Sequence, residues 1–178
     1  MTHTDDEQGL AARHAVTIRR ASPADAAGIA SVVAAIAAER VHSAIDRAWS
    51  VEEEERYLAS LTARDAIHVA IHETEGVVGF QSVERWSSMF TSMAHVGQCG
   101  TFLLPHWRRR GLGRQLWRST RAFADEAGYR KLVIMVRGAN ENAQAFYQGL
   151  GFRVCGRLTS QVVIDGVADD EVVMEQFI

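Results

Sequence analysis

The sequence predicts an α/β domain in which helices are layered on a mixed β-sheet. Apolar residues recur with a period of two in some segments and at helical spacings in others. These segments follow the order strand, two helices, three strands, helix, strand, helix, two strands. A length of 178 residues, 47% of them hydrophobic and only two of them proline, suits one domain with a substantial core. No repeat, low-complexity tract or long linker divides the chain.

The first predicted elements are a strand and two capped helices. Residues 16–20 alternate like a strand, and a helix begins after Ser22, which can cap it, with Asp25 three positions later. Ser50 and Glu53 repeat this capping pattern before a second helix. Apolar residues at helical spacings give each helix one buried face: Ile29, Val32, Val33 and Ile36 in the first, and Tyr57, Leu58 and Leu61 in the second.

Residues 67–71 and 77–85 predict two antiparallel strands joined by a tight turn. His68 and His72 lie on the first strand, but at roughly 3.3 Å per residue they stand about 13 Å apart, too far to bind one metal ion. We therefore expect structural histidines and no metal site. The following loop, residues 86–93, carries more apolar residues than a solvated turn. It either covers a substrate or packs against the domain.

The second half of the chain continues the alternation of strands and helices. An apolar strand is stopped by Pro105, which cannot donate to a sheet, and a glycine turn leads into a long helix. The predicted elements are a strand at 96–104, a helix from Leu112 to about Gly128, a strand at 131–136, a short helix at 142–149 and closing strands at 154–163 and 171–178.

Composition argues against several classes of protein. A net charge of −3 disfavours a general nucleic-acid binder. Only Cys99 and Cys155 are present, too few for a disulfide framework, which favours a reducing compartment. No apolar stretch reaches the roughly 20 residues that span a bilayer, and the amino-terminal segment lacks the apolar core of a signal peptide. We expect a cytoplasmic protein with a flexible tail over residues 1–14 and a single domain over residues 15–178.

Residues 108–113 read Arg-Arg-Arg-Gly-Leu-Gly and stand between an apolar strand and a helix. Glycines at such a junction let backbone N–H groups approach an anion, and the helix N-terminus adds partial positive charge. The arginines, with Arg114, supply forked donors that match phosphate oxygens. By itself the motif fits a solvated basic helix start, but its position favours a pyrophosphate site. The GxGxxG and GxxxxGK patterns are missing, which argues against dinucleotide and nucleoside triphosphate binding.

A second motif follows the next strand, where residues 140–147 read Asn-Glu-Asn-Ala-Gln-Ala-Phe-Tyr and lead to Gly151 and Phe152. Together the two motifs imply an acyl-CoA site. In this order and in these elements they resemble the motifs of the GNAT superfamily of N-acetyltransferases, over roughly residues 16–178. The resemblance implies three layers, with a central mixed, mostly antiparallel sheet flanked by helices and splayed between its fourth and fifth strands. It also implies acetyl-CoA as co-substrate, bound in the cleft between the splayed strands.

The resemblance also implies which residues form the site. The strand end would pair with pantetheine, the loop after it would hold the pyrophosphate, and two asparagines would line the far side of the cleft. The implied cofactor-binding residues are Phe102, Leu103, Leu104, Arg109, Arg110, Gly111, Leu112, Gly113, Arg114, Asn140, Asn142 and Tyr147. Tyr147 would also be the general acid, because a phenol with an ordinary pKa of about 10 stays protonated and can protonate the leaving thiolate. The structural alternative is a core tyrosine whose hydroxyl is hydrogen-bonded.

The general base stays open at the level of sequence. An alkyl ammonium with a pKa of about 10.4 must lose a proton before it attacks. Several members of the superfamily place a glutamate early on the strand that enters the cleft, but residues 95–98 here read His-Val-Gly-Gln. Glu84, His95 and Glu39 are the candidates, and each also has a structural explanation. Positioning alone can supply much of the acceleration, so a dedicated base is not required.

Two functions follow from the resemblance. The first is transfer of an acetyl group from the CoA thioester directly to a primary amine of a small molecule, an amino acid or a peptide N-terminus, with the acceptor beside the 86–93 loop. The second is a non-catalytic acyl-CoA-binding module with a regulatory role, which the missing strand carboxylate supports and Tyr147 opposes. The expected partners are acetyl-CoA and an amine acceptor, with no nucleic acid and no membrane. The closing strands allow a homodimer.

Overall fold

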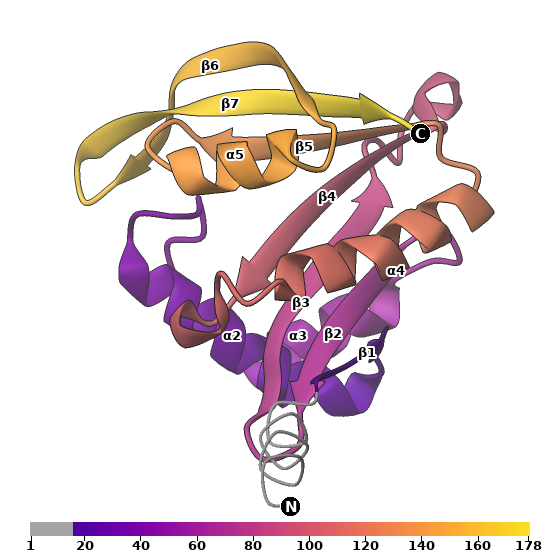
Figure 1. Cartoon of the computed structure of the whole chain (residues 1–178), viewed down its shortest axis with the longest axis vertical. Helices are drawn as coiled ribbons and strands as arrows, with labels where there is room; N and C mark the ends of the chain where they lie inside the picture. Colours follow the sequence, from indigo (N-terminus) through magenta and orange to yellow (C-terminus); the bar gives the residue numbers. More distant parts are fainter. Residues whose placement is uncertain (1–15) are drawn as a thin grey trace, which may run out of the picture.

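The computed structural model describes residues 16–178, so the tail predicted over residues 1–14 lies outside the described part of the chain. The order of strands and helices is the predicted one (Figure 1). The elements are β1 Val16–Arg20, α2 Ala26–Glu39, α3 Val51–Ser60, β2 Ala66–His72, β3 Gly76–Arg85, β4 Val96–Leu103, α4 Leu112–Glu126, β5 Lys131–Arg137, α5 Glu141–Gln148, β6 Arg153–Ile164 and β7 Val167–Phe177. Short 3-10 turns precede α2, β4 and α4, at Pro23–Asp25, Thr91–Met93 and Pro105–Trp107.

The strands form one sheet in the order β1-β2-β3-β4-β5-β7-β6. Neighbouring strands are antiparallel except β4 and β5, which run parallel. These two strands are in register only from Val96 opposite Lys131 to Gln98 opposite Val133. Beyond these pairs they diverge, and Figure 1 shows β4 leaving β5 at an angle. The predicted splay between the fourth and fifth strands is confirmed.

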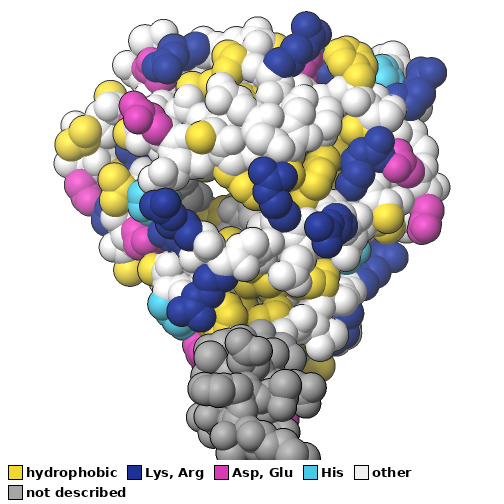
Figure 2. Space-filling model, in the orientation of Figure 1, with side chains coloured by type: hydrophobic (Ala, Val, Ile, Leu, Met, Phe, Trp, Pro, Cys, Tyr) yellow, Lys and Arg dark blue, Asp and Glu magenta, His cyan; other side chains and the backbone are white. Residues whose placement is uncertain are grey.

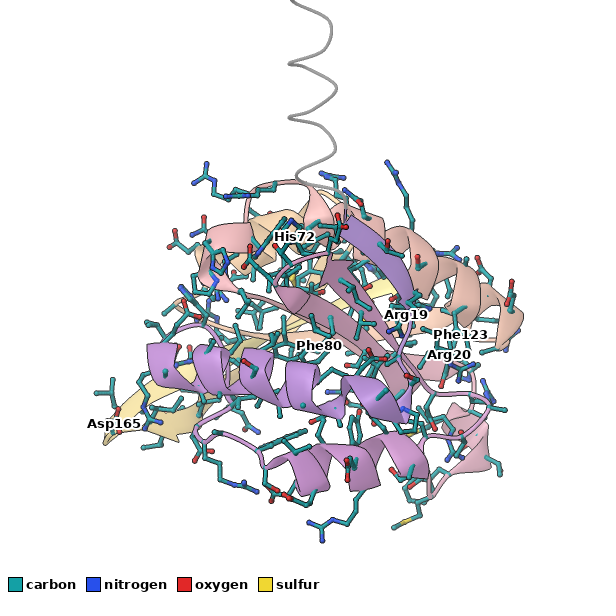
Figure 3. All side chains as sticks on the ribbon, turned by 90° about the horizontal axis from the view of Figure 1, so that it is seen from below. Arg19, Arg20, His72, Phe80, Phe123 and Asp165 are labelled. Carbon is teal, nitrogen blue, oxygen red and sulfur yellow. The ribbon has the colours of Figure 1, made fainter. Side chains whose placement is uncertain are left out.

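Helices cover both faces of the sheet, which gives the three predicted layers. α2 and α3 lie together on one face (Figures 1 and 3), where the predicted stripe of α2 is buried against Ile67, Val69 and Phe80. α4 and α5 lie on the other face, and Trp117 and Tyr147 belong to the core there. The carboxyl end of β4 and the amino end of α4 therefore both reach the edge of the splay.

Local signals explain where the first helices begin. Ser22 and Asp25 form a capping box, and the carboxylate of Asp25 also pairs with Arg19 at 2.7 Å. Ser50 Oγ accepts a hydrogen bond from Glu53 N at 3.1 Å, while the Glu53 carboxylate accepts one from Ser50 N at 2.8 Å. Both predicted caps are confirmed.

β1 is fixed against α4 by a cation–π contact. The guanidinium of Arg20 lies 5.0 Å from the ring centre of Phe123, and Figure 3 shows the two side chains next to each other. Because β1 is an edge strand paired only with β2, this contact ties the beginning of the described chain to the helix that follows the arginine motif.

The last two strands are longer than the sequence pattern predicted. β7 begins at Val167, four residues before the predicted start, because a two-residue turn at Asp165 and Gly166 joins it directly to β6. Both turn residues have positive φ, 53° and 77°, as a tight hairpin of this kind requires. Asp169 and Asp170 interrupt the apolar pattern in the sequence, so the pattern predicts a later beginning for this strand.

The two histidines of β2 are buried in different surroundings. His68 Nδ1 lies 3.1 Å from Thr120 Oγ1, and burial lowers the His68 pKa to about 4. The His72 ring packs 4.8 Å from the ring of Trp107. Within residues 16–178, no group of three or more potential ligands is arranged to hold a metal ion. No helix in the same range is both long and apolar enough to cross a membrane.

Candidate functional site

Two adjoining cavities lie where β4 and β5 separate. The larger, of about 590 Å³, is bounded by the turn before α4 and is called the loop cavity. The smaller, of about 460 Å³, lies over β3, β4, β5 and β7 and is called the sheet cavity. The residues that line both are His42, Ser43, Thr101, Phe102, Asn140, Ala143 and Tyr147. Because they share these walls, the cavities form one continuous cleft.

The floor of the loop cavity is built from backbone donors. Arg109 and Gly111 both adopt left-handed conformations, with φ of 61° and 78°, and α4 begins at Leu112. The backbone N–H groups of residues 109–113 have no acceptor within the described chain. A turn of unpaired N–H groups at the positive end of a helix binds anions.

The arginines of the motif divide into two groups. Arg109 and Arg114 line the loop cavity, and Figure 2 shows Lys and Arg side chains around a hollow in this face. Arg108 also lines it, but its guanidinium pairs with Glu39 at 2.7 Å and donates to Leu103 O at 3.1 Å. Arg110 stacks on Trp107, 5.0 Å from the ring centre, and does not line the cavity. Arg109 has no hydrogen-bond or ion-pair partner within residues 16–178, so its guanidinium is available to a phosphate.

The far wall of the loop cavity is the beginning of α5. Asn140 caps this helix, because its Oδ1 accepts from Ala143 N at 3.1 Å, and its Nδ2 donates to His42 O at 2.9 Å. Asn142 lines the cavity as well. A Cβ added to Gly113 would lie 2.9 Å from Phe146 Cζ, so glycine at this position lets α4 approach α5 closely.

Most of the predicted cofactor-binding residues line the loop cavity, and two do not. Leu104 donates its backbone N–H to Val78 O at 3.0 Å and packs into the core, and Arg110 is held by Trp107. The predicted residues that line the cavity are Phe102, Leu103, Arg109, Gly111, Leu112, Gly113, Arg114, Asn140, Asn142 and Tyr147.

Tyr147 lies at the junction of the two cavities. Its ring is 5% exposed and packs between Phe146 and Phe152, with ring centres 5.0 and 5.5 Å away. Its hydroxyl donates to Thr101 Oγ1 at 2.8 Å, and Gln81 Nε2 donates to the same oxygen at 2.6 Å. Burial raises the pKa of the Tyr147 phenol, so the group stays protonated at neutral pH.

The sheet cavity carries two carboxylates, Glu84 of β3 and Glu171 of β7. Glu84 accepts a hydrogen bond from the Tyr57 hydroxyl. Glu171 has no side-chain partner within the described residues, and burial raises its pKa. Gln98, in the region where the resemblance would place a glutamate, also lines this cavity.

The remaining predicted base candidates lie elsewhere. Glu39 is bound by Arg108, and His95 stands at the far end of β4, where its carbonyl accepts from the N–H groups of Arg130 and Lys131. Neither residue lines the cleft. The 86–93 loop contributes no residue to either cavity, and Met89 in it is 79% exposed. Residues 42–45, which follow α2, occupy the side of the sheet cavity instead.

The sequence interpretation missed Thr101 and Glu171. Thr101 stands one position before Phe102, the first of the residues expected to pair with pantetheine, so the residue spacing already placed it beside the cleft. Glu171 gives no such signal, because in the sequence it marks only the start of the predicted last strand. Its place in the cleft depends on the pairing of β5 with β7, which sets it opposite Arg137.

The family model for the GNAT acetyltransferase domain matches residues 63–154, just over half of the chain. No curated protein matches the sequence. Among solved structures, a GNAT superfamily phosphinothricin acetyltransferase from Sinorhizobium meliloti in complex with acetyl-CoA superposes with a TM-score of 0.84 at 21% identity, covering 92% of this chain and 88% of that one. A ribosomal-protein-alanine N-acetyltransferase from Brucella melitensis gives a TM-score of 0.84 at 20% identity, over 91% and 99% of the two chains. A GCN5-related N-acetyltransferase from Kribbella flavida gives 0.80 at 23% identity, over 92% and 98%.

Proposed function

Because the chain belongs to the GNAT acetyltransferase family, we propose that it is an N-acetyltransferase that moves an acetyl group from acetyl-CoA directly to a primary amine. One observation carries the proposal: a single cleft joins an anion-binding turn to a buried tyrosine and then to a second cavity with carboxylate walls. The turn suits a pyrophosphate, the junction suits a thioester, and the second cavity leaves room for an acceptor.

The residues of the loop cavity fit acetyl-CoA. The unpaired N–H groups of residues 109–113 and the guanidinium of Arg109 supply donors for phosphate oxygens. Past Gln98, β4 has no register partner on β5, so its backbone groups on that side are available to the amides of pantetheine. Thioesters supply an activated acyl group and a good leaving group.

Tyr147 has the properties of a general acid. Its raised pKa keeps the phenol protonated, and Thr101 and the neighbouring aromatic rings hold the hydroxyl at the junction of the cavities. The phenol would donate its proton to the departing sulfur as the carbon–sulfur bond breaks. Acetyl transfer would then proceed without a covalent intermediate on the protein.

The compartment and the acceptor belong to the same proposal. Cys99 and Cys155 are both unpaired, which supports a reducing compartment such as the cytoplasm. The sheet cavity, lined by residues 42–45 on one side and by the ends of β5 and β7 on another, would hold the acceptor amine. A small molecule, an amino acid or a peptide N-terminus each presents such an amine.

The first test measures release of CoA thiol and formation of acetylated products with a panel of amines. Tyr147→Phe should lower the amine-dependent rate about 10- to 100-fold, because a positioned acid typically contributes at least that much, while its Kd for acetyl-CoA stays within about threefold of the original. Tyr129→Phe is the matched control, since Tyr129 is equally buried but donates to Arg64 O outside the cleft.

Binding of acetyl-CoA without amine-dependent thiol release across the panel would contradict the enzymatic proposal. It would support instead the non-catalytic acyl-CoA-binding module, for which Gln98 in place of a carboxylate is the supporting feature. A loss of rate in Tyr129→Phe equal to that in Tyr147→Phe would show that the effect comes from packing and not from proton donation.

A further inference from the structure

In the proposed N-acetyl transfer, the acceptor loses a proton before it attacks the thioester. A primary ammonium, with a pKa of about 10.4, is almost fully protonated near neutral pH and cannot attack until it loses a proton. Gln98, in the first part of β4, lines the sheet cavity, and an amide is not a base at this pH. A carboxylate that could accept the proton therefore has to come from another wall of the cavity.

Glu171 occupies such a wall. Val172 and Met174 of β7 are buried in the core beside α4 and α5. Because successive side chains of a strand point to opposite faces of the sheet, Glu171 points to the other face, the one on which α2 lies. The sheet cavity lies on this face, and Glu171 lines it while being only 7% exposed. A carboxylate in such a site keeps few waters and gains basicity, which agrees with its raised pKa.

In the described part of the chain, the charged groups around Glu171 are paired with other residues and leave its carboxylate unpaired. Arg137, opposite it on β5, directs its guanidinium to Asp169 Oδ2 at 2.9 Å and to Arg40 O at 2.7 Å. Asp170, its neighbour on β7, is held by Arg157 of β6 at 2.8 Å, and the β6 residue in register with Glu171 is the apolar Leu158. The other titratable side chains that line the cavity are His42, Glu84, Arg85, Cys99 and Tyr147.

The other carboxylates considered as bases, and the Cys99 thiol, are committed or distant. Glu84 already accepts the hydroxyl proton of Tyr57 in a hydrogen bond, and burial raises the pKa of the Cys99 thiol to about 12, which keeps it protonated. Glu39 is paired with Arg108 outside the sheet cavity. We propose that Glu171 is the proton acceptor of the reaction, the carboxylate that converts the bound ammonium of the acceptor into the attacking amine. This assignment rests on the proposed N-acetyltransferase function.

The protons balance across the two assigned residues. Glu171 takes one proton from the ammonium and becomes a carboxylic acid, which leaves a neutral amine with a free electron pair. That pair forms the nitrogen–carbon bond while the electrons of the carbon–sulfur bond leave with sulfur, which takes its proton from Tyr147. A second proton is lost from nitrogen as the amide forms and restores the phenol, and Glu171 releases its proton to solvent through the cleft. The sum is ammonium plus acetyl-CoA giving amide, CoA thiol and one proton.

The experiment compares pH profiles of Glu171→Gln and the original protein with two acceptors. One acceptor is the best alkylamine of the panel, and the other is an amine with a pKa below about 6, which is already neutral at pH 7. With the alkylamine, Glu171→Gln should lower kcat near neutral pH by at least about tenfold. It should also remove the increase of kcat/KM with pH that accompanies ionisation of the carboxylate. The loss of kcat relative to the original protein should become smaller toward pH 10. It should also be smaller for the low-pKa acceptor, while the Kd for acetyl-CoA stays unchanged.

Matched variants separate a proton acceptor from a structural residue. Glu175→Gln changes the same residue type on the same strand and face, but Glu175 is bound by Lys131 and Arg153, so it should keep the profile of the original protein. Glu171→Asp keeps a carboxylate and should retain the carboxylate-dependent rise with a lower kcat, even if Glu171→Gln folds poorly. A loss of kcat in Glu171→Gln that is equal at every pH and with both acceptors would overturn the assignment. The assignment would also be overturned if Glu84→Gln lost the increase of kcat/KM with pH and Glu171→Gln kept it.

The proposed function fails in a different way. Absence of acetyl transfer by the original protein, with acetyl-CoA bound, would overturn N-acetyl transfer and the role of Glu171 with it. Normal transfer by the original protein, together with an unchanged pH profile in Glu171→Gln, would overturn only the role of Glu171.

Discussion

Thr101 connects the proposed acid to the body of the sheet. Its Oγ1 receives hydrogen bonds from Tyr147 at 2.8 Å and from the fully buried Gln81 at 2.6 Å. Two donors fill the acceptor positions of a hydroxyl, so Thr101 fixes where the Tyr147 oxygen stands. Thr101 lines both cavities, and the phenol it holds is therefore placed where the acyl group would pass from one to the other.

We expect Thr101→Val to lower kcat about tenfold with little change in the Kd for acetyl-CoA. Valine keeps the shape of threonine but removes the acceptor, which leaves the buried Tyr147 hydroxyl without its partner and free to turn away. Steady-state kinetics and calorimetric binding measure the two quantities. Thr120→Val is the control, because it makes the same change at a buried threonine that meets His68 outside the cleft. Equal kinetic losses in both variants would show that Thr101 has no special relation to Tyr147.

At the scale of elements, α3 carries a buried acid that makes stability depend on pH. Glu54 is 1% exposed, its Oε2 has no hydrogen-bond partner among residues 16–178, and burial raises its pKa to about 7. The folded state therefore holds this proton more tightly than the unfolded chain does. The favourable contribution is complete below pH of about 4.5 and is lost as pH rises through about 7.

We expect Glu54→Gln to remove most of this pH dependence. Through this group, the free energy of unfolding of the original protein should fall by about 1–2 kcal/mol between pH 5 and pH 8. This value allows for screening of the carboxylate by nearby water. Urea unfolding at the two pH values measures the difference. Glu55→Gln, on the exposed side of the same helix, should leave the difference as it is. An identical pH dependence in Glu54→Gln would contradict the assignment of the proton to Glu54.

At the scale of the whole molecule, the cleft divides the sheet into β1–β4 and β5–β7. The two parts are joined directly by only three register pairs between β4 and β5. Residues 40–42 add links across the cleft, because Arg40 pairs with Asp165 at 2.8 Å, Arg137 donates to Arg40 O, and Asn140 donates to His42 O. Asp165 lies at the tip of the β6–β7 hairpin (Figure 3), so this segment ties the end of α2 to the last strands. A ligand that contacts both walls should stabilise the entire fold.

Acetyl-CoA at about 100 times its Kd should raise the free energy of unfolding by about 2.7 kcal/mol, and Tm by roughly 5–10 °C for a domain of this size. At the same concentration, Arg109→Ala should give about half of this gain in stability, because the loss of one charge-assisted phosphate contact weakens binding roughly tenfold. Arg110→Ala is the matched control, since Arg110 stacks on Trp107 outside the cavity. Thermal unfolding with and without the ligand measures the shift, and the absence of a shift in the original protein would contradict acetyl-CoA binding.

Features that depend on neighbouring residues in the chain can be predicted from the sequence alone. The capping boxes at Ser22 and Ser50 are made within four residues, and the order of elements follows from local periodicity. The turn proposed to hold the pyrophosphate also belongs here, because Gly111 at positive φ directly before α4 is a property of a few consecutive residues.

Which side chains meet in the cleft depends on contacts that form only when the whole chain folds. Arg108 belongs to the same motif as Arg109, yet it is bound by Glu39, a residue 69 positions away in the chain. Thr101 and Gln81 meet because β3 pairs with β4, and Glu171 reaches the cavity because β7 inserts between β5 and β6. The physical reason is the period of two along a strand: strand pairing and register decide which face a side chain takes, and these depend on contacts distant in sequence.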